Sequence, residues 1–110
     1  AVFAFGVVYG TPVDTVAEIP GMIRAIIESL DSTRFDRAHF KGFGDSSLDF
    51  EVVYYVLSPE FGVYMDLQQQ INLALMRRFQ EKGIEFAFPT RTVVITGNAD
   101  LPVPGGAVRR

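Results

Sequence analysis

The sequence predicts an α+β domain with the element order β-α-β-β-α-β. Three observations support this prediction. The chain has 110 residues, of which 48% are hydrophobic and 21% charged, so it can bury the core of one domain. Apolar residues alternate with a period of two in some segments and of 3.6 in others, as strands and helices require. Clusters of Gly, Pro, Ser and Asp separate these segments.

The first half of the chain reads as a strand followed by a helix. Residues 2–9 alternate as a strand covered on at least one face. Thr11 is a favourable N-cap and Pro12 suits the first helical position, so we expect a helix over residues 12–30. Its apolar stripe is Val16, Ile19, Ile23, Ile26, Ile27 and Leu30. Pro20 lies within this helix and should kink or split it.

The second half contains an antiparallel hairpin and a second helix. Residues 37–43 and 48–57 read as strands, and the polar cluster at residues 44–47 reads as the turn between them. In the second strand Leu48, Phe50, Val52, Tyr54 and Val56 share one face. The second helix is expected over residues 63–82, ending at Gly83 as its C-cap.

A last extended segment follows the second helix. It comprises residues 86–88 and 92–95, with Pro89 between them. The complete order is that of the ferredoxin-like fold, an antiparallel four-stranded sheet with two helices on one face. We expect this domain to span residues 1–96. The Pro- and Gly-rich residues 97–110 are expected to form a flexible tail.

Composition excludes several classes of function. The net charge of −3 provides no basic surface for nucleic acid, and no apolar run approaches the length of a membrane span. The chain has no Cys and one His, so the sequence predicts no cofactor and no metal site. It begins at Ala1 without an initiator Met or a targeting segment. We therefore expect that it was processed or cut from a longer chain.

The residue types of catalysis are present but not in a convincing pattern. His39 with Ser46, Ser47 and a nearby Asp has the composition of a nucleophilic triad, yet no nucleophile elbow accompanies it. Asp49 and Glu51 project from one strand face without a third ligand, which is typical of a solvated surface. The sequence therefore predicts no catalytic residue and no enzymatic activity.

Apolar residues outside the two core stripes predict a subunit interface. Some lie on the strand face that the helices leave open. Others lie on the second helix at roughly 120–200° from the centre of its core stripe, counting 100° per residue. Together they give more apolar surface than one small domain can hide. The candidate interface residues are Val53, Tyr55, Leu57, Met65, Leu73, Met76, Phe86 and Phe88.

Two stretches resemble a known family. Residues 34–52 (RFDRAHFKGFGDSSLDFEV) and 83–90 (GIEFAFPT), with the helix over 64–79, resemble the C-terminal cytoplasmic domain of small-conductance mechanosensitive (MscS-type) channels. The resemblance covers roughly residues 2–95, and its motifs are structural. One departure is Ala87, where relatives commonly have a second Pro, which we expect to loosen the approach to the last strand.

The resemblance implies a part of a channel. In such channels seven copies of this domain form the wall of a cytoplasmic vestibule, with the transmembrane pore in an upstream part of the same chain. It thus implies a heptamer at the cytoplasmic face of the inner membrane, with this domain itself soluble and not inserted in the bilayer. Asp49 and Glu51 are possible wall charges. The alternative is a free-standing ferredoxin-like module that binds a small regulatory ligand.

Overall fold

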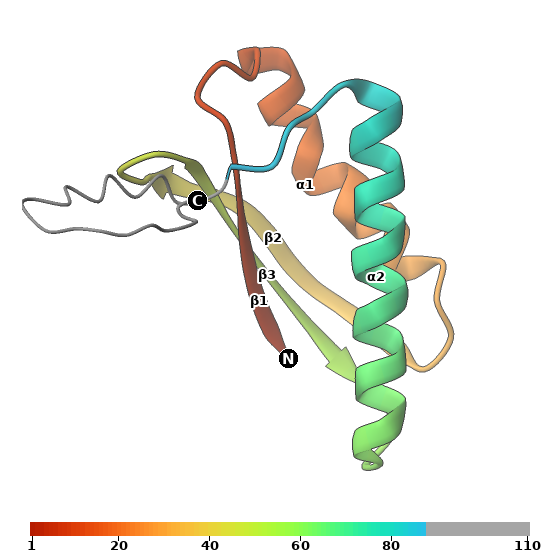
Figure 1. Ribbon diagram of the computed structural model, residues 1–110. Coiled ribbons are helices and arrows are strands. Elements are labelled where there is room, and N and C mark those ends of the chain that lie inside the picture. The colour runs from red at the N-terminus through yellow and green to blue at the C-terminus, as the bar shows by residue number, and fades with distance from the viewer. Residues whose placement is uncertain (88–110) are drawn as a thin grey trace, which may run out of the picture.

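The computed structural model describes residues 1–87 as an α+β fold with a three-stranded antiparallel sheet (Figure 1). Strands β1 (Val2–Val7), β2 (Thr33–Phe43) and β3 (Leu48–Val56) lie in the order β1-β3-β2. The longest strand of the prediction therefore occupies the centre of the sheet. This confirms the α+β class, whereas most of the predicted fourth strand lies outside the described residues.

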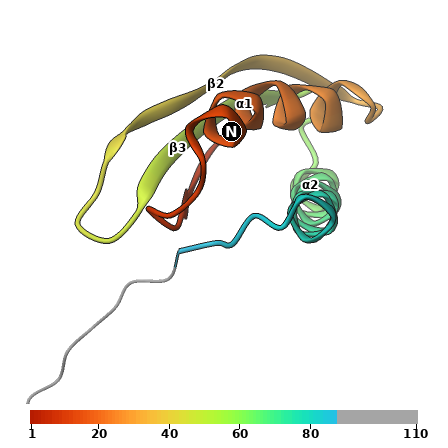
Figure 2. The same ribbon diagram turned by 90° about the horizontal axis from the view of Figure 1, so that it is seen from above.

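Both helices lie on the same side of the sheet. Helix α1 (Val13–Glu28) follows β1, and helix α2 (Phe61–Lys82) follows β3. In Figure 2 the sheet curves over α1, and α2 stands beside α1. The opposite face of the sheet has no helix over it among the described residues, as the element order predicts.

The start of α1 differs from the prediction. Pro12, with φ −59° and ψ 145°, is the N-cap, and the helix begins one residue later. Thr11 does not cap the helix, because its hydroxyl donates a hydrogen bond to the Val8 carbonyl at 2.7 Å. The helix continues through Pro20 as one element, so of the two expected outcomes, a kink or a split, the split does not occur. The apolar stripe of α1 extends on both sides of Pro20 and holds both parts of the helix against the sheet, although Pro20 has no N–H to donate to the helix.

The boundaries of α2 and β2 also differ from the predicted ones. Helix α2 begins at Phe61, two residues earlier than predicted, and ends at Gly83, whose φ of 70° confirms the left-handed C-cap. Strand β2 begins four residues earlier than predicted. Its register shifts between Phe35 and Arg37 and again between Phe40 and Gly42. These irregularities break the two-residue alternation on which the sequence prediction depends.

The core lies between the sheet and the two helices. The inward face of β3 is almost fully buried, as its alternation predicts, and the Phe5 and Phe50 rings stack with centroids 5.2 Å apart. Helix α2 contributes Ile71, Leu75 and Phe79 to the same cluster. The described chain has no buried polar or charged residue. Apolar burial is therefore the main source of its stability.

The free edge of β1 receives the chain that follows α2. Val7 forms an antiparallel bridge with Phe86, the Val8 N–H donates to the Glu85 carbonyl at 3.1 Å, and the Ala87 N–H donates to the Gly6 carbonyl at 2.9 Å. The expectation that Ala87 loosens this approach was wrong. A Pro at this position would lack the N–H that makes the second of these bonds.

Gly6 is required where β1 passes the hairpin. A Cβ added to Gly6 would lie 2.7 Å from the Ser47 Cβ, closer than packed carbons approach. Gly6→Ala should therefore lower the free energy of unfolding by about 1–3 kcal/mol, measured by urea denaturation. Gly10→Ala is the matched control, because a Cβ there meets nothing within 4 Å. Equal losses in the two variants would contradict the close approach.

Tyr54 makes stability depend on pH at the alkaline end. Its side chain is fully buried, and its hydroxyl donates to Gln68 Oε1 at 2.8 Å. Burial, with a smaller contribution from Tyr64, raises the pKa of Tyr54 from 10.0 to about 12. The folded state disfavours the phenolate, so Tyr54 makes the free energy of unfolding depend on pH. Its contribution to that free energy is fully present below pH 10 and is lost as the pH rises towards 12.

The Tyr54→Phe variant tests this linkage. The wild type should lose about 2 kcal/mol more of its free energy of unfolding than the variant does between pH 9 and pH 12. Urea denaturation at a series of pH values measures the difference. Identical pH dependence in the two proteins would show that Tyr54 has the same pKa in the folded and unfolded states.

Candidate subunit interface

The structure places the predicted interface residues in two regions. On the sheet, Tyr55 is 43% and Leu57 62% exposed, whereas Val53 is only 8% exposed. Val53 is covered because it lies on the central strand between its cross-strand neighbours Val2 and Arg37. On α2 the predicted residues Met65, Leu73 and Met76 are each about half exposed. Phe86 is half-buried against the core, and Phe88 lies outside the described residues.

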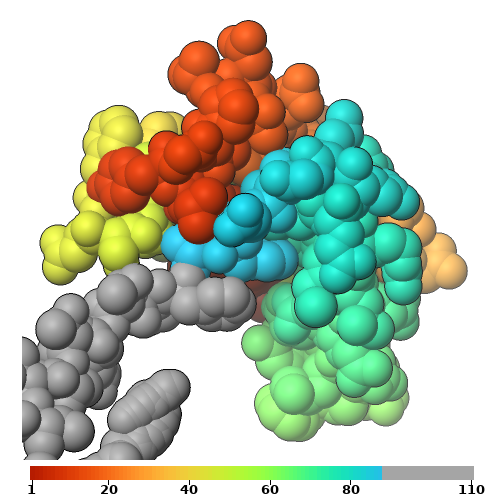
Figure 3. All heavy atoms as spheres, turned by 45° about the horizontal axis from the view of Figure 1, so that its top comes forward, coloured from red at the N-terminus to blue at the C-terminus, as the bar shows by residue number. Residues whose placement is uncertain are grey.

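An exposed apolar row runs along the outward side of α2. We define the α2 stripe as Phe61, Met65, Leu73 and Met76, which are between 47% and 72% exposed. Their spacings of four, eight and three residues keep them on one side of the helix. In Figure 3, α2 (green to teal) forms one side of the molecule, and no other described element lies over it in this view.

The residues interspersed with the α2 stripe are polar but uncharged. Gln69, Asn72 and Gln80 occupy the same side of the helix by the 100° periodicity. Of the charged residues near the end of α2, Arg78 lies 3.7 Å from Glu81 and Lys82 reaches Glu18 of α1 at 3.9 Å, whereas Arg77 borders the stripe beside Leu73 and Met76. Depletion of charge together with enrichment in Met and Phe is characteristic of the centre of a protein interface.

Phe61 was missed at the sequence level. It precedes Met65 by four residues and is 72% exposed, more than any other member of the stripe. The prediction began α2 at residue 63, so Phe61 was assigned to the preceding loop. Its i, i+4 spacing to Met65 was a signal that could have extended both the helix and the interface.

The outward face of the sheet is more polar than the sequence suggested. Arg34 places its guanidinium 4.5 Å from the centre of the Tyr55 ring, which covers part of that ring. Lys41 on β2 lies 3.6 Å from the Glu51 carboxylate on β3. The exposed apolar part of this face is therefore limited to Tyr55 and Leu57 at the end of β3 and to Val2 at the start of β1.

The residue types considered for catalysis do not assemble into a site. The Ser47 hydroxyl donates to Asp49 Oδ1 at 2.5 Å, whereas His39 stands opposite Glu51 in the β2–β3 register. His39 is exposed, and its side chain makes none of the hydrogen bonds found in residues 1–87. Within those residues no group of three His, Cys, Asp or Glu side chains could hold a metal ion. Nor is any helix there long and apolar enough to cross a bilayer.

Residues 1–86 match the family described as the C-terminal domain of the mechanosensitive ion channel MscS. The chain belongs to the MscS family of mechanosensitive channels. The resemblance carried by the hairpin and the segment after α2 is thereby confirmed.

Individual relatives agree with this assignment. The small-conductance mechanosensitive channel MscMJ of Methanocaldococcus jannaschii is 37% identical over 91 residues, covering 82% of this chain and 26% of the relative. The large-conductance channel MscMJLR of the same organism is 35% identical over 95 residues, with the same coverage. The chain thus spans about a quarter of the length of these relatives.

A solved structure shares the fold. The crystal structure of Helicobacter pylori MscS in the closed state superposes with a TM-score of 0.56 at 23% sequence identity. The similarity covers 89% of this chain and 38% of that one. It supports the arrangement of strands and helices described above.

Proposed function

We propose that this chain forms part of the cytoplasmic vestibule wall of a mechanosensitive channel. In this proposal seven copies surround the vestibule at the inner face of the membrane, and a transmembrane pore belongs to the same longer polypeptide. The domain contributes assembly and access for ions and small solutes, and it has no catalytic role. Membership of the MscS family supports the proposal, and the α2 stripe is the observation that carries it.

The α2 stripe is assigned to the contact between neighbouring copies. Its four side chains are each about half exposed or more, and Arg77 lies at the margin of the stripe and not between its members, so the stripe exposes an extended apolar area to water, which is unfavourable. Tyr55 and Leu57 provide a second, smaller apolar area at the end of β3. A ring needs two different surfaces on each copy, because each copy contacts one neighbour on either side.

The charged face of the sheet is assigned to the solvent of the vestibule. Arg34, Arg37, His39 and Lys41 project from β2, and Asp49 and Glu51 project from β3. All six side chains are exposed or half-exposed. Charges on a wall influence the local concentration of passing ions, and this face offers both signs.

The complete domain is proposed to have the ferredoxin-like order. The bridge between Val7 and Phe86 is antiparallel and lies on the free edge of β1, where that fold places its fourth strand. We assign residues 86–95 to this strand and the domain to residues 1–96. Residues 97–110 would then follow the domain as a tail.

Two measurements test the proposed function. The reading frame that encodes this chain should contain hydrophobic helices upstream, and a frame without them would contradict the channel assignment. Light scattering of the 110-residue chain over a concentration series should show association that Tyr55→Glu and Leu73→Glu both weaken. An unchanged mass for both variants at concentrations where the wild type associates would contradict the interface.

A further inference from the structure

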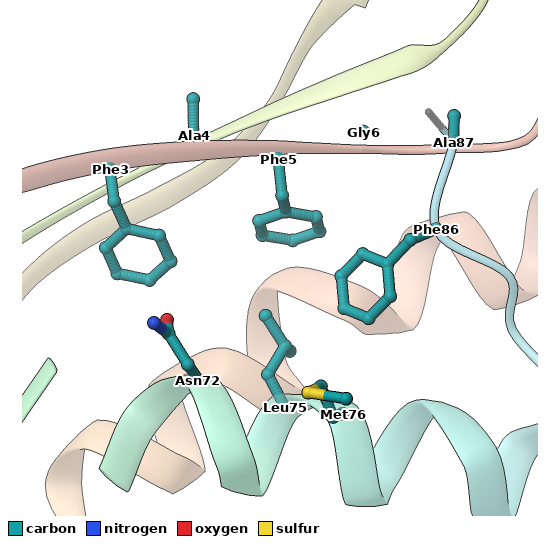
Figure 4. A pocket seen from close by; sticks show the side chains of 9 residues that line it. All are labelled: Phe3, Ala4, Phe5, Gly6, Asn72, Leu75, Met76, Phe86 and Ala87. Atoms are coloured by element: carbon teal, nitrogen blue, oxygen red, sulfur yellow. The ribbon is translucent and has the colours of Figure 1, made fainter. Parts of the chain in front are cut away.

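A groove separates the free edge of β1 from α2. It has a volume of about 470 Å³. Figure 4 shows the Phe3 and Phe5 rings projecting from β1 towards α2, with Leu75, Met76 and Asn72 on the opposite side and Phe86 at one end. Apart from Asn72, the side chains that line the groove are apolar. Such a groove gains stability from an apolar occupant.

Backbone hydrogen bonds lead the chain to this groove. The residues on either side of Phe86 bond to β1 through the Val8 N–H and the Ala87 N–H. These two bonds fix an antiparallel register in which Phe86 is opposite Val7. In an antiparallel pair each step forward on one strand is a step back on the other, so the next residue on the same face after Phe86 is opposite Phe5.

That residue is Phe88. We propose that the groove is the docking site for Phe88 of the same chain, whose ring lies beside Phe5 and against Leu75 and Met76. Residues directly opposite each other in a sheet project to the same face, and the face of Phe5 is the one that faces α2. The proposal rests on the fourth strand proposed above, and Met76 is the one residue that the groove shares with the α2 stripe.

The same register limits how the segment is held. Ala87 directs its N–H towards β1, so two residues later Pro89 directs its nitrogen towards the Ala4 carbonyl. Pro has no N–H to donate, so the hydrogen-bonded ladder is interrupted there. Burial of the Phe88 ring, more than backbone pairing, must therefore hold the chain to this edge.

A segment of the same chain is favoured over a second copy as the occupant. Phe88 is one residue beyond Ala87, which is already bonded to Gly6. A tether of one residue gives an effective local concentration that a separate molecule reaches only at about millimolar concentration or above. A neighbouring copy would also have to displace this segment from the edge of β1.

Methyl NMR of the intact 110-residue chain tests the docking. The sequence has three Met residues, so labelling of the Met methyl groups gives three resonances: Met22 in the core, Met65 on the stripe and Met76 in the groove. Phe88→Leu should shift the Met76 resonance, because an aromatic ring in contact is removed, and leave the other two in place. Phe43→Leu is the matched control, since Phe43 is 77% exposed on the hairpin, and it should shift none of them.

The outcomes separate this inference from the proposed function. A Met76 shift that persists at a dilution where light scattering shows a monomer supports docking within one chain. No shift, or a shift seen only where the chain associates, would overturn it in favour of an empty groove or a second copy. If all three resonances moved, the nuclear Overhauser effect between the Phe88 ring and the Met76 methyl of the wild type would decide, its absence overturning the proposal. Association through the stripe is read from Met65 alone, so either proposal can fail without the other.

Discussion

Phe79→Ala should lower the free energy of unfolding by about 3–5 kcal/mol, as expected for removal of a fully buried ring. Phe79 is 1% exposed, and its ring centroid lies 4.5 Å from that of Phe86 and 5.8 Å from that of Phe5. It therefore joins three elements: α2, β1 and the segment that follows α2. Since domains of this size are stable by about 5–15 kcal/mol, this loss is a large fraction of the total free energy of unfolding.

Urea denaturation measures this loss, with Phe43→Ala as the matched control. Phe43 is 77% exposed, and among the aromatic residues of the described range 1–87 it contacts only the rings of Tyr9 and Phe40. The same change of side chain should cost less than about 1 kcal/mol there. A loss at Phe79 no greater than that at Phe43 would mean that α2 is not packed against β1 as described.

Leu73→Glu should strongly reduce assembly of the full-length channel. If the α2 stripe is covered by a neighbouring copy, the new carboxylate must lose its water, and Arg77, one turn further along the helix beside Leu73 and Met76, offsets only part of that cost. Removing a charged group from water costs several kcal/mol even where it is paired, and about 1.4 kcal/mol corresponds to a factor of ten in affinity. Seven such contacts in a ring make the effect on the complete assembly larger.

Native mass spectrometry of the channel in detergent measures the effect. Gln70→Glu places the same charge on the same helix at an exposed position away from the stripe, and it should leave the assembly intact. Assembly of Leu73→Glu to the same extent as Gln70→Glu would exclude the centre of the α2 stripe from the contact between copies.

The central strand and both helices could be predicted because their local signals agree with the tertiary structure. In β3 the residues from Leu48 to Val52 alternate strictly, since one face meets the core. The C-cap at Gly83 could be predicted because only Gly adopts that backbone conformation at little cost. Such signals depend on neighbours within a few residues along the chain.

Features that depend on contacts distant in sequence could not be predicted. Thr11 has the residue type of an N-cap, but the carbonyl of Val8 takes its hydroxyl instead. Val53 belongs to the outward face by alternation, yet its flanking strands cover it. The early start of β2 follows from pairing with β3, where Thr33 is opposite Val56, and no periodic pattern marks it.

The candidate interface could be predicted in part, because some of its residues follow a local periodic pattern and others do not. Met65, Leu73 and Met76 were identified from helical periodicity alone, and their exposure confirms that they lie off the core stripe. Phe61 was missed because the helix boundary was misplaced by two residues. The groove beneath β1 had no sequence signal, since it is formed by side chains that individually read as core residues.

Oxidation of Met65 by hydrogen peroxide tests most directly the claim that neighbouring copies cover the α2 stripe. Its side chain is 49% exposed in a single copy, whereas Met22 is 6% exposed and serves as an internal reference. If neighbouring copies cover the stripe, Met65 should oxidise several-fold more slowly in the assembled channel than in the monomeric chain, relative to Met22. Equal rates in the two samples would show that the outward side of α2 faces water in the channel, and that assembly uses another surface.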